Sequence, residues 1–331
     1  MALKVAINGT GRIGLIVAKI VTARDDMELV ALNTTTKPDM LEYLLKYDSV
    51  HKGVDAKVID DSSINIGGNV VKMFSERDAS LIEFGKCGAE VVIECTGAYL
   101  TTEKCKAHLR DGVKKVVISA PAKDDTPTYV LNINTDAYSG EEIISNASCT
   151  TNCLAPICKV LDEEFGIENG LMTTIHSYTN DQNILDVKHK SDFRRARAAA
   201  VNMIPTTTGA AKAIAKVMPN LLGKLNGYAM RVPTADVSVV DLTVNLKKDV
   251  TIESVNEAMD KASKAGFAGL LEIDYDKRVS SDFIGSTYSS TFVPDMTSVV
   301  DGTTVKVLAW YDNEWGYSSR LVDMVKFVGT K

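Results

Sequence analysis

Cys149 is the residue of this chain whose setting best suits chemistry. It lies in the segment SNASCTTNC at positions 145–153, just before the helix-like residues 154–165, where Pro156 should cost a hydrogen bond or cause a kink. The dipole of a helix stabilises a thiolate at its N-terminus and lowers the thiol pKa from its usual value of about 8.5. Only about 3% of an unperturbed thiol is ionised at pH 7, so a nucleophilic cysteine needs this help. The segment therefore predicts a nucleophile with a lowered pKa.

A cysteine nucleophile also needs a base, and the chain has four histidines. His176 follows the strand-like run 171–175, and strand ends often present catalytic side chains; a structural histidine is the plain alternative. We expect His51 and His108 to be surface residues, whereas His189 lies in a basic, polar stretch. Cys153 has no further ligands nearby for a metal site, and we expect the remaining cysteines to be inert.

A glycine motif, NGTGRIG at positions 8–14, lies between a predicted strand and a predicted helix. Gly9 permits a tight turn, Gly11 lets the backbone approach a pyrophosphate, and Gly14 lets the helix pack closely on the strand. The motif therefore indicates dinucleotide binding, with a glycine-rich turn that binds nothing as the alternative.

The residue that should hold the adenosine ribose bears on the choice between the two nicotinamide cofactors. An acidic side chain is expected about 20 residues after the last glycine of the motif, and that position is Thr34 in NTTTK at 33–37. A carboxylate repels a 2′-phosphate, whereas three hydroxyls and Lys37 can hydrogen-bond one. We therefore favour NADP or dual use, with NAD bound through a threonine as the alternative.

Three other places gather groups that suit anions. The segment DFRRARAAA at 192–200 has three arginines in four positions, TTTGAAK at 206–212 precedes a predicted helix, and Arg231 ends a predicted strand. Hydroxyls and unpaired N–H groups at a helix N-terminus favour an anion. A solvated or subunit-contacting loop and simple capping by threonine are the alternatives for the first two segments.

The composition is that of a soluble globular protein with two domains. The 331 residues are 45% hydrophobic and 24% charged, and 37 basic against 43 acidic residues give a net charge of −6. This balance argues against a disordered or fibrous chain and against a nucleic-acid binder. We find no apolar stretch of membrane-spanning length, and six cysteines are too few for a disulfide framework. We expect a cytoplasmic protein with reduced thiols.

The order of the predicted elements indicates an α/β protein. In the first half, apolar runs of strand length alternate with helical patterns, as in a parallel sheet covered on both faces. The expected strands are 4–8, 28–33, 91–95 and 116–119, the helices are 13–23 and 102–111, and a hairpin lies within 52–75. The second half favours antiparallel strands at 168–176, 224–232, 235–246 and 303–310, with helices at 209–217 and 252–265. An apolar stripe over 317–328 predicts a final helix.

The chain resembles the phosphorylating glyceraldehyde-3-phosphate dehydrogenase family in a series of motifs that keep the family's order and spacing. The motifs are SNASCTTNC, HSYTNDQ, RRARAAA, PTTTGAAKA, RVPT with VSVVDLT, and WYDNEWGYS. The resemblance implies a Rossmann-type, parallel-sheet dinucleotide-binding domain at 1–148. It also implies an α+β catalytic domain with a mainly antiparallel sheet at 149–313, and a C-terminal helix, 314–331, that packs back on the first domain.

The same resemblance implies a reaction. Cys149 is the nucleophile and His176 its partner, as a thiolate–imidazolium pair that attacks the aldehyde to form a hemithioacetal. His176 takes a proton as hydride leaves for the nicotinamide, which is help worth about 10²–10⁴-fold in rate. The backbone N–H of Cys149 stabilises the oxyanion. Inorganic phosphate then attacks the thioester and releases 1,3-bisphosphoglycerate.

The remaining site residues are carried over from the family's motifs. The phosphate of glyceraldehyde 3-phosphate is expected at Thr179 and Arg231, and the attacking phosphate at Ser148, Thr150, Thr208, Gly209 and Arg195. The cofactor is expected at Gly9, Gly11, Arg12, Ile13, Gly14, Thr34, Arg77, Ser119, Lys188, Asn313 and Tyr317. No metal is expected. The family is homotetrameric, with the loop around 178–201 reaching the cofactor of a neighbouring subunit.

Several positions depart from the family pattern. Thr34 replaces an aspartate and Val187-Lys188 replace Leu-Pro, and both changes remove features of NAD-dependent members, which favours NADP or dual use. Thr10 stands for phenylalanine, Leu15 for arginine and Ala235-Asp236 for Pro-Asn, while Ser191 is an extra residue. One alternative is erythrose-4-phosphate dehydrogenase, which hydrolyses the thioester; another is a binding protein without turnover. A semialdehyde dehydrogenase lacks support from the phosphate-site motifs.

Overall fold

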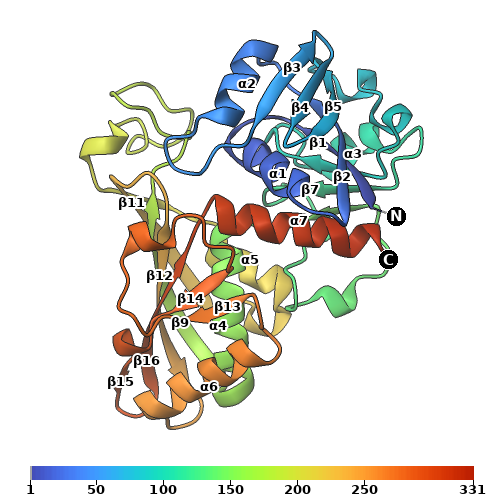
Figure 1. The fold of residues 1–331 in the computed structure, drawn as a ribbon. Coiled ribbons are helices and arrows are strands. Elements are labelled where there is room, and N and C mark those ends of the chain that lie inside the picture. Colours follow the sequence, from blue (N-terminus) through green and yellow to red (C-terminus); the bar gives the residue numbers. More distant parts are fainter. Residues whose placement is uncertain (1) are drawn as a thin grey trace. The chain divides into compact units, whose positions relative to one another are not determined.

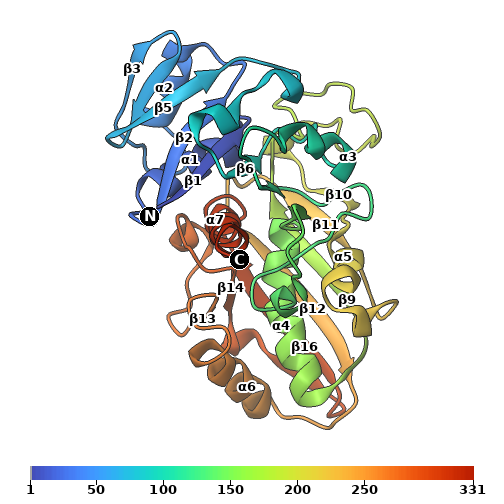
Figure 2. The same cartoon turned by 90° about the vertical axis from the view of Figure 1, so that its right-hand side faces the viewer.

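The computed structural model describes residues 2–331, which fall into two compact units (Figures 1 and 2). Unit 1 contains the chain up to Leu131, Thr135–Ser148 and Ser318–Lys331. Unit 2 contains Asn132–Asn134 and Cys149–Tyr317.

Unit 1 is built on an eight-stranded sheet of order β3-β4-β5-β2-β1-β6-β7-β8. Its strands are β1 Leu3–Asn8, β2 Met27–Asn33, β3 Ala56–Asp60, β4 Ser63–Ile66, β5 Asn69–Phe74, β6 Val91–Glu94, β7 Lys115–Ile118 and β8 Ile143–Ser145. In the order of the sheet, the neighbouring strands β5, β2, β1, β6, β7 and β8 all pair in parallel. β6 is buried at every position, as expected for a sheet covered on both faces.

The far edge of this sheet differs from the single predicted hairpin. Three strands lie there, because β3 pairs with β4 and β4 with β5, both in antiparallel fashion. Gly67 and Gly68 form the turn between β4 and β5 with φ of +58° and +92°, values that glycine adopts without strain. β5 then pairs in parallel with β2, so the edge is continuous with the sheet.

Helices complete unit 1. They are α1 Arg12–Thr22, α2 Pro38–Lys46, α3 Thr102–Cys105 and the part of α7 Trp315–Gly329 from Ser318 onward, with 3₁₀ turns at Ala79–Leu81, Phe84–Cys87, Lys106–His108 and Thr135–Ala137. Leu321, Val325 and Val328 of α7 belong to the same buried cluster as β1. The predicted helix over 102–111 ends early, and α2 had no counterpart among the predictions.

Unit 2 contains a second sheet of order β10-β11-β9-β12-β16-β14-β13, with β15 paired to β16. Its strands are β9 Ile167–Ser177, β10 Ile204–Thr207, β11 Leu225–Val232, β12 Ser238–Leu246, β13 Leu271–Ile273, β14 Ser290–Phe292, β15 Ser298–Val300 and β16 Thr304–Tyr311. Most pairs are antiparallel, whereas β9–β11 and β13–β14 are parallel. Together the two sheets confirm the predicted fold class.

One long helix lies along the second sheet. α4 Cys149–Phe165 contacts β9, β12, β14 and β16, and Figure 2 shows it running beside these strands. The other elements are α5 Ala210–Val217, α6 Ile252–Lys264, and 3₁₀ turns at Ala199–Val201, Pro219–Leu221, Ser280–Phe283 and Pro294–Met296. α4 begins at Cys149, five residues before the predicted start, and retains Pro156 in its interior.

Two histidines that we expected at the surface are buried, so that prediction is wrong. His51 is 5% exposed and His108 2% exposed. His108 stacks on Phe84, and its Nε2 lies 3.3 Å from the buried Glu94 carboxylate. The polar ring therefore has a polar partner inside unit 1. None of the helices among residues 2–331 is both long and apolar enough to cross a bilayer.

Replacing Gly14 by alanine should destabilise unit 1. The added Cβ would lie 1.9 Å from the carbonyl oxygen of Gly9, and overpacking of this kind costs about 1–3 kcal/mol. Gly11→Ala is the matched control, because nothing lies within 4 Å of a Cβ there and its φ of −69° suits alanine. Denaturant unfolding of the ligand-free protein should therefore show a lower free energy for Gly14→Ala alone. Equal stabilities of the two variants would contradict this close packing.

Candidate functional site

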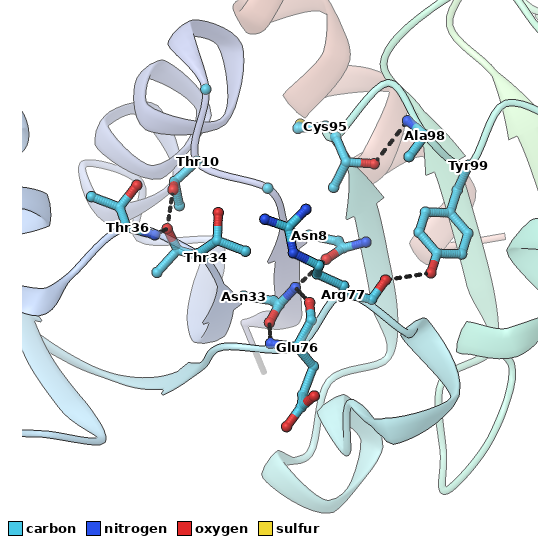
Figure 3. A pocket seen from close by; sticks show the side chains of 14 residues that line it. Asn8, Thr10, Asn33, Thr34, Thr36, Glu76, Arg77, Cys95, Ala98 and Tyr99 are labelled. Carbon is cyan, nitrogen blue, oxygen red and sulfur yellow. Dashed lines mark hydrogen bonds between the residues drawn. The ribbon is translucent and has the colours of Figure 1, made fainter.

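Unit 1 has a pocket of about 460 Å³ at the carboxyl ends of its central strands (Figure 3). β1, β2 and β6 end at Asn8, Asn33 and Glu94, and ligands of open parallel sheets bind at this edge. The pocket is lined by Asn8, Gly9, Thr10, Gly11, Asn33, Thr34, Thr35, Thr36, Glu76, Arg77, Cys95, Thr96, Ala98 and Tyr99. Four of the predicted cofactor residues are therefore grouped here: Gly9, Gly11, Thr34 and Arg77.

A buried polar network fixes the floor of this pocket. The amide of Asn8 donates to the Glu94 carboxylate at 2.6 Å, and the amide of Asn33 donates to Asn8 Oδ1 at 2.8 Å. Asn33 Oδ1 accepts from the backbone N–H of Glu76 at 2.8 Å, a contact drawn in Figure 3. Three strand ends and the loop at Glu76 are thus tied together. These links join residues up to 86 positions apart, so local sequence patterns do not reveal them.

The N-terminus of α1 suits a pyrophosphate. Its N-cap, Gly11, makes no side-chain capping bond, and no acidic residue lies in the first turn. Its first N–H groups therefore keep their attraction for an anion, and no Cβ at Gly11 blocks the approach. Ile13 packs against the core, whereas Arg12 donates to Asp48 at 3.0 Å. The residues present fit the dinucleotide that the motif predicts.

The side of the pocket at Thr34 carries hydroxyls. Thr10 and Thr34 share a hydrogen bond of 2.5 Å between their hydroxyls, and the backbone N–H of Thr36 donates to Thr34 at 3.0 Å. Figure 3 shows the guanidinium of Arg77 in the middle of the pocket, and Tyr99 donates to the Arg77 carbonyl at 2.9 Å. Thr10 and Tyr99 were not predicted as pocket residues. Their positions depend on loops that meet only in the folded unit.

The reactive centre of unit 2 lies where α4 begins and β9 ends. Cys149 is the first residue of α4, and its Sγ lies 3.6 Å from Nε2 of His176, the second-last residue of β9. In the parallel register of β9 and β11, His176 stands opposite Arg231. The structure therefore brings together three of the predicted site residues.

The Nδ1 atom of His176 has two close neighbours. The Ser177 carbonyl lies at 2.8 Å and Nη1 of Arg231 also at 2.8 Å, while Arg231 donates to that same carbonyl at 3.0 Å. A carbonyl only accepts and a guanidinium only donates, so these contacts assign no single tautomer. Burial, and next the charge of Arg231, lower the pKa of His176 to about 3. His176 is therefore neutral at pH 7.

The ionisation of Cys149 differs from the sequence-based expectation. Burial raises the thiol pKa, although the charge of Arg231 and hydrogen bonds from Thr150 act in the opposite direction. The expected lowering by the helix N-terminus is therefore outweighed, and the ligand-free pair is a thiol beside a neutral imidazole. Cys153, one turn further along α4, is fully buried, and burial raises the pKa of its thiol to about 12.

Tyr311 supports this centre and was not predicted. Its hydroxyl lies 2.8 Å from the Thr150 hydroxyl and 2.9 Å from the Thr174 hydroxyl, and its ring is edge-on to His176 with centroids 6.0 Å apart. Thr150, a predicted substrate residue, is thus held by Tyr311 at the first turn of α4. The tyrosine belongs to the motif WYDNEWGYS, which was the available signal.

The guanidinium of Arg195 is held by three hydrogen bonds. It donates to Asp181 at 2.6 Å, to the Thr206 hydroxyl at 2.8 Å and to the Thr207 carbonyl at 3.0 Å. Since a guanidinium has five N–H donors, two remain for a ligand. Thr208 accepts from the N–H of Ala210 at 3.2 Å. This bond lies at the start of α5.

The remaining predicted residues occupy varied surroundings. Gly209 caps α5 without a side-chain bond, Thr179 and Ser148 are half-buried, and Ser119 donates its N–H to the Glu94 carbonyl at 2.9 Å. Lys188 is exposed in the loop after β9, and Tyr317 is buried in the first turn of α7. 

Asn313 has a defined orientation in unit 2. Its Oδ1 accepts from the hydroxyls of Ser177 at 2.9 Å and Ser238 at 2.6 Å, which leaves its amide N–H groups as the donors that a ligand can meet.

Family models match both parts of the chain. The NAD binding domain of glyceraldehyde 3-phosphate dehydrogenase matches residues 3–102, and the C-terminal domain of the same enzyme matches residues 148–313.

Curated relatives are similar along the whole chain. Glyceraldehyde-3-phosphate dehydrogenase of Geobacillus stearothermophilus is 52% identical and that of Priestia megaterium 50% identical, each over 100% of this chain and 99% of the relative. The chloroplastic glyceraldehyde-3-phosphate dehydrogenase A of Zea mays is 50% identical over 97% of this chain and 81% of its own length. The chain belongs to the glyceraldehyde-3-phosphate dehydrogenase family.

Proposed function

We propose that this chain oxidises D-glyceraldehyde 3-phosphate and phosphorylates the product to 1,3-bisphosphoglycerate, with NADP or NAD as the oxidant. The observation that carries the proposal is the position of Cys149 Sγ, 3.6 Å from His176 Nε2 and under the influence of the Arg231 charge. A nucleophile, a base and a cation for the substrate's phosphate are thus joined in unit 2. Family membership supports the aldehyde as substrate.

His176 moves protons in the proposed reaction. Its neutral Nε2 takes the thiol proton of Cys149 as the sulfur bonds to the aldehyde carbon, and this proton passes to the carbonyl oxygen to give a hemithioacetal. A bound nicotinamide would supply the acceptor for the hydride that leaves this carbon. His176 removes the hydroxyl proton during that loss and leaves a thioester on Cys149. General-base help of this type is worth about 10²–10⁴-fold.

Two groups of residues are proposed to bind phosphate. Arg231 and Thr179 bind the phosphate that the aldehyde carries, and Arg195 with the start of α5 binds inorganic phosphate. The two N–H donors left on Arg195 and the exposure of Gly209 at the start of α5 support the second assignment. The phosphate oxygen attacks the thioester carbon, and the Cys149 sulfur leaves and regains its proton from His176. The further ligands are Ser148, Thr150 and Thr208.

The cofactor is proposed to bind along the pocket of unit 1. Gly9, Gly11, Arg12, Ile13 and Gly14 hold the pyrophosphate. A 2′-phosphate is accommodated by Thr34, whose hydroxyl takes the place of the acidic side chain that the cofactor motif leads us to expect, with Arg77 in the same pocket. Lys188 is proposed to add positive charge to the cofactor site. Ser119, Asn313 and Tyr317 are proposed to position the nicotinamide end.

We also propose that the protein is a homotetramer. Between β9 and β10, Phe193 is 97% exposed and Ile184 81% exposed, which is costly unless another surface covers them. Light scattering that gave the mass of a single chain would contradict this. All six cysteines are free thiols, in keeping with the expected cytoplasmic location.

Removing the nucleophile or the base should separate their roles. Cys149→Ser should abolish formation of reduced cofactor, because a hydroxyl is a far weaker nucleophile. His176→Asn should lower kcat about 10²–10⁴-fold. Cofactor affinity, measured by fluorescence titration, should change less than twofold in both variants. Full turnover by Cys149→Ser would remove Cys149 as the nucleophile.

Inorganic phosphate should be required for repeated turnover. Without it, reduced cofactor should appear as a single burst of about one equivalent per active site, because the thioester has no acceptor. With it, steady absorbance growth at the reduced-nicotinamide band should follow. Rapid turnover without phosphate, and a preference for erythrose 4-phosphate, would favour the hydrolysing relative instead.

The identity of residue 34 should set the cofactor preference. The wild type should use NADP at a kcat/KM comparable to or above that for NAD. Thr34→Asp should raise the KM for NADP at least tenfold by charge repulsion, while Thr34→Ala, which adds no charge, controls for loss of the hydroxyl. A hundredfold preference of the wild type for NAD would overturn the proposed NADP use.

A further inference from the structure

His189 forms a bridge inside the loop between β9 and β10. Its Nδ1 lies 3.2 Å from the backbone N–H of Ser191 and 3.0 Å from that of Asp192, and its Nε2 lies 3.2 Å from Asp181 Oδ1. Only 8% of its side chain is exposed. The sequence around this histidine predicts only a basic, polar stretch.

These contacts define the protonation of the ring. Two N–H donors point at Nδ1, so Nδ1 must be an unprotonated acceptor, and Nε2 carries the proton that is donated to Asp181. A proton on Nδ1 would face both backbone donors and break the turn at residues 189–192. The present loop geometry therefore requires neutral His189.

Both ends of the bridge lead to Arg195. Asp181 accepts from His189 through one oxygen and from Arg195 through the other, at 2.6 Å. Asp192, whose N–H is held by His189, accepts from the N–H of Arg194 at 2.8 Å and from the Thr206 hydroxyl at 2.5 Å. That hydroxyl in turn accepts from Arg195.

We infer that His189 is a positioning residue for inorganic phosphate: it holds Asp181 and the turn at Asp192, which together orient the Arg195 guanidinium. The inference rests on the proposed function, which assigns Arg195 to that phosphate. Burial acts to raise the pKa of Asp181, but the hydrogen bonds from His189 and Arg195 outweigh it and the pKa is lowered. Asp181 is therefore a carboxylate that both side chains share.

The charged groups that face His189 are Asp181, Asp192 and Arg195. Loss of the imidazole would release both Asp181 and the turn at Asp192. Arg195 would then lose the support that reaches it through Thr206, and phosphate binding should weaken.

Three substitutions dissect the bridge. His189→Ala removes both ends and should raise the KM for phosphate about tenfold. His189→Asn keeps an acceptor near Nδ1, and His189→Gln keeps a donor near Nε2, so each should raise that KM only about threefold. The phosphate-free burst and the KM for aldehyde and cofactor should change less than twofold. Lys190→Gln, which removes a charge from the exposed neighbouring residue, should leave the KM for phosphate within twofold.

The difference between the effect on the KM for phosphate and the effect on the other kinetic constants is a readout that a purely structural role would not move. Nitrogen NMR of histidine-labelled wild type, assigned with His189→Asn, should show Nδ1 unprotonated at pH 8.

The outcomes separate this inference from the proposed function. Unchanged phosphate KM in all three variants, an equal rise in every KM, or an Nδ1–H tautomer overturns the role of His189. Wild-type turnover that ignores phosphate contradicts the proposed function instead. The NMR result does not depend on turnover, so it tests the geometry independently of the kinetic measurements.

Discussion

The parallel register of β9 and β11 is the constraint on which the reactive centre depends. It sets His176 opposite Arg231, and a slip by one residue would turn the arginine to the other face of the sheet. Gly227 allows this register, because a Cβ there would lie 2.1 Å from the carbonyl oxygen of Met172, its partner in β9. β12 pairs with the other edge of β9 and holds it from that side.

The same register gives Cys149, at the start of α4, a histidine neighbour. A cysteine at the start of a helix gains some stabilisation as a thiolate, but burial outweighs it here and raises the thiol pKa. What the fold adds is a nearby acceptor for the proton. On the proposed function, transfer of the proton from Cys149 to His176 leaves the total charge of the pair unchanged, and the nucleophile and its base act as one unit.

The sequence predicted elements and motifs well and their long-range contacts poorly. Strand and helix periodicity located β9, β11 and α1 to within two residues, because these patterns are local. α2 was not predicted. His108 was wrongly predicted to be a surface residue, because its buried partner Glu94 belongs to β6, a separate segment of the chain. The hydrogen bonds around Asn8 and Tyr311 also join residues that are far apart in the sequence. The residue types show that these side chains are polar, but only the fold shows which of them are hydrogen-bonded to each other.

The orientation of the proposed anion-binding groups could be predicted only in part for the same reason. The motifs placed Arg195 and Arg231 in the site by resemblance, whereas the carboxylate that holds Arg195 and the histidine beside Arg231 became visible in the sheet and its loops. Thr34 shows the reverse case. Its chemistry could be argued directly from the absence of an acidic side chain, because the cofactor motif fixes the distance along the chain.

On the proposed function, the surroundings of Arg231 explain how a chain of net charge −6 can bind phosphate. The partners described for Arg231 within residues 2–331 are neutral: the His176 ring and the Ser177 carbonyl. Burial lowers the pKa of this guanidinium, which is still protonated at pH 7, and no ion pair to a carboxylate is among its described contacts. On the proposed function, the phosphate of the aldehyde supplies the missing counter-charge. Substrate binding and the orientation of the aldehyde beside Cys149 then draw on one electrostatic interaction.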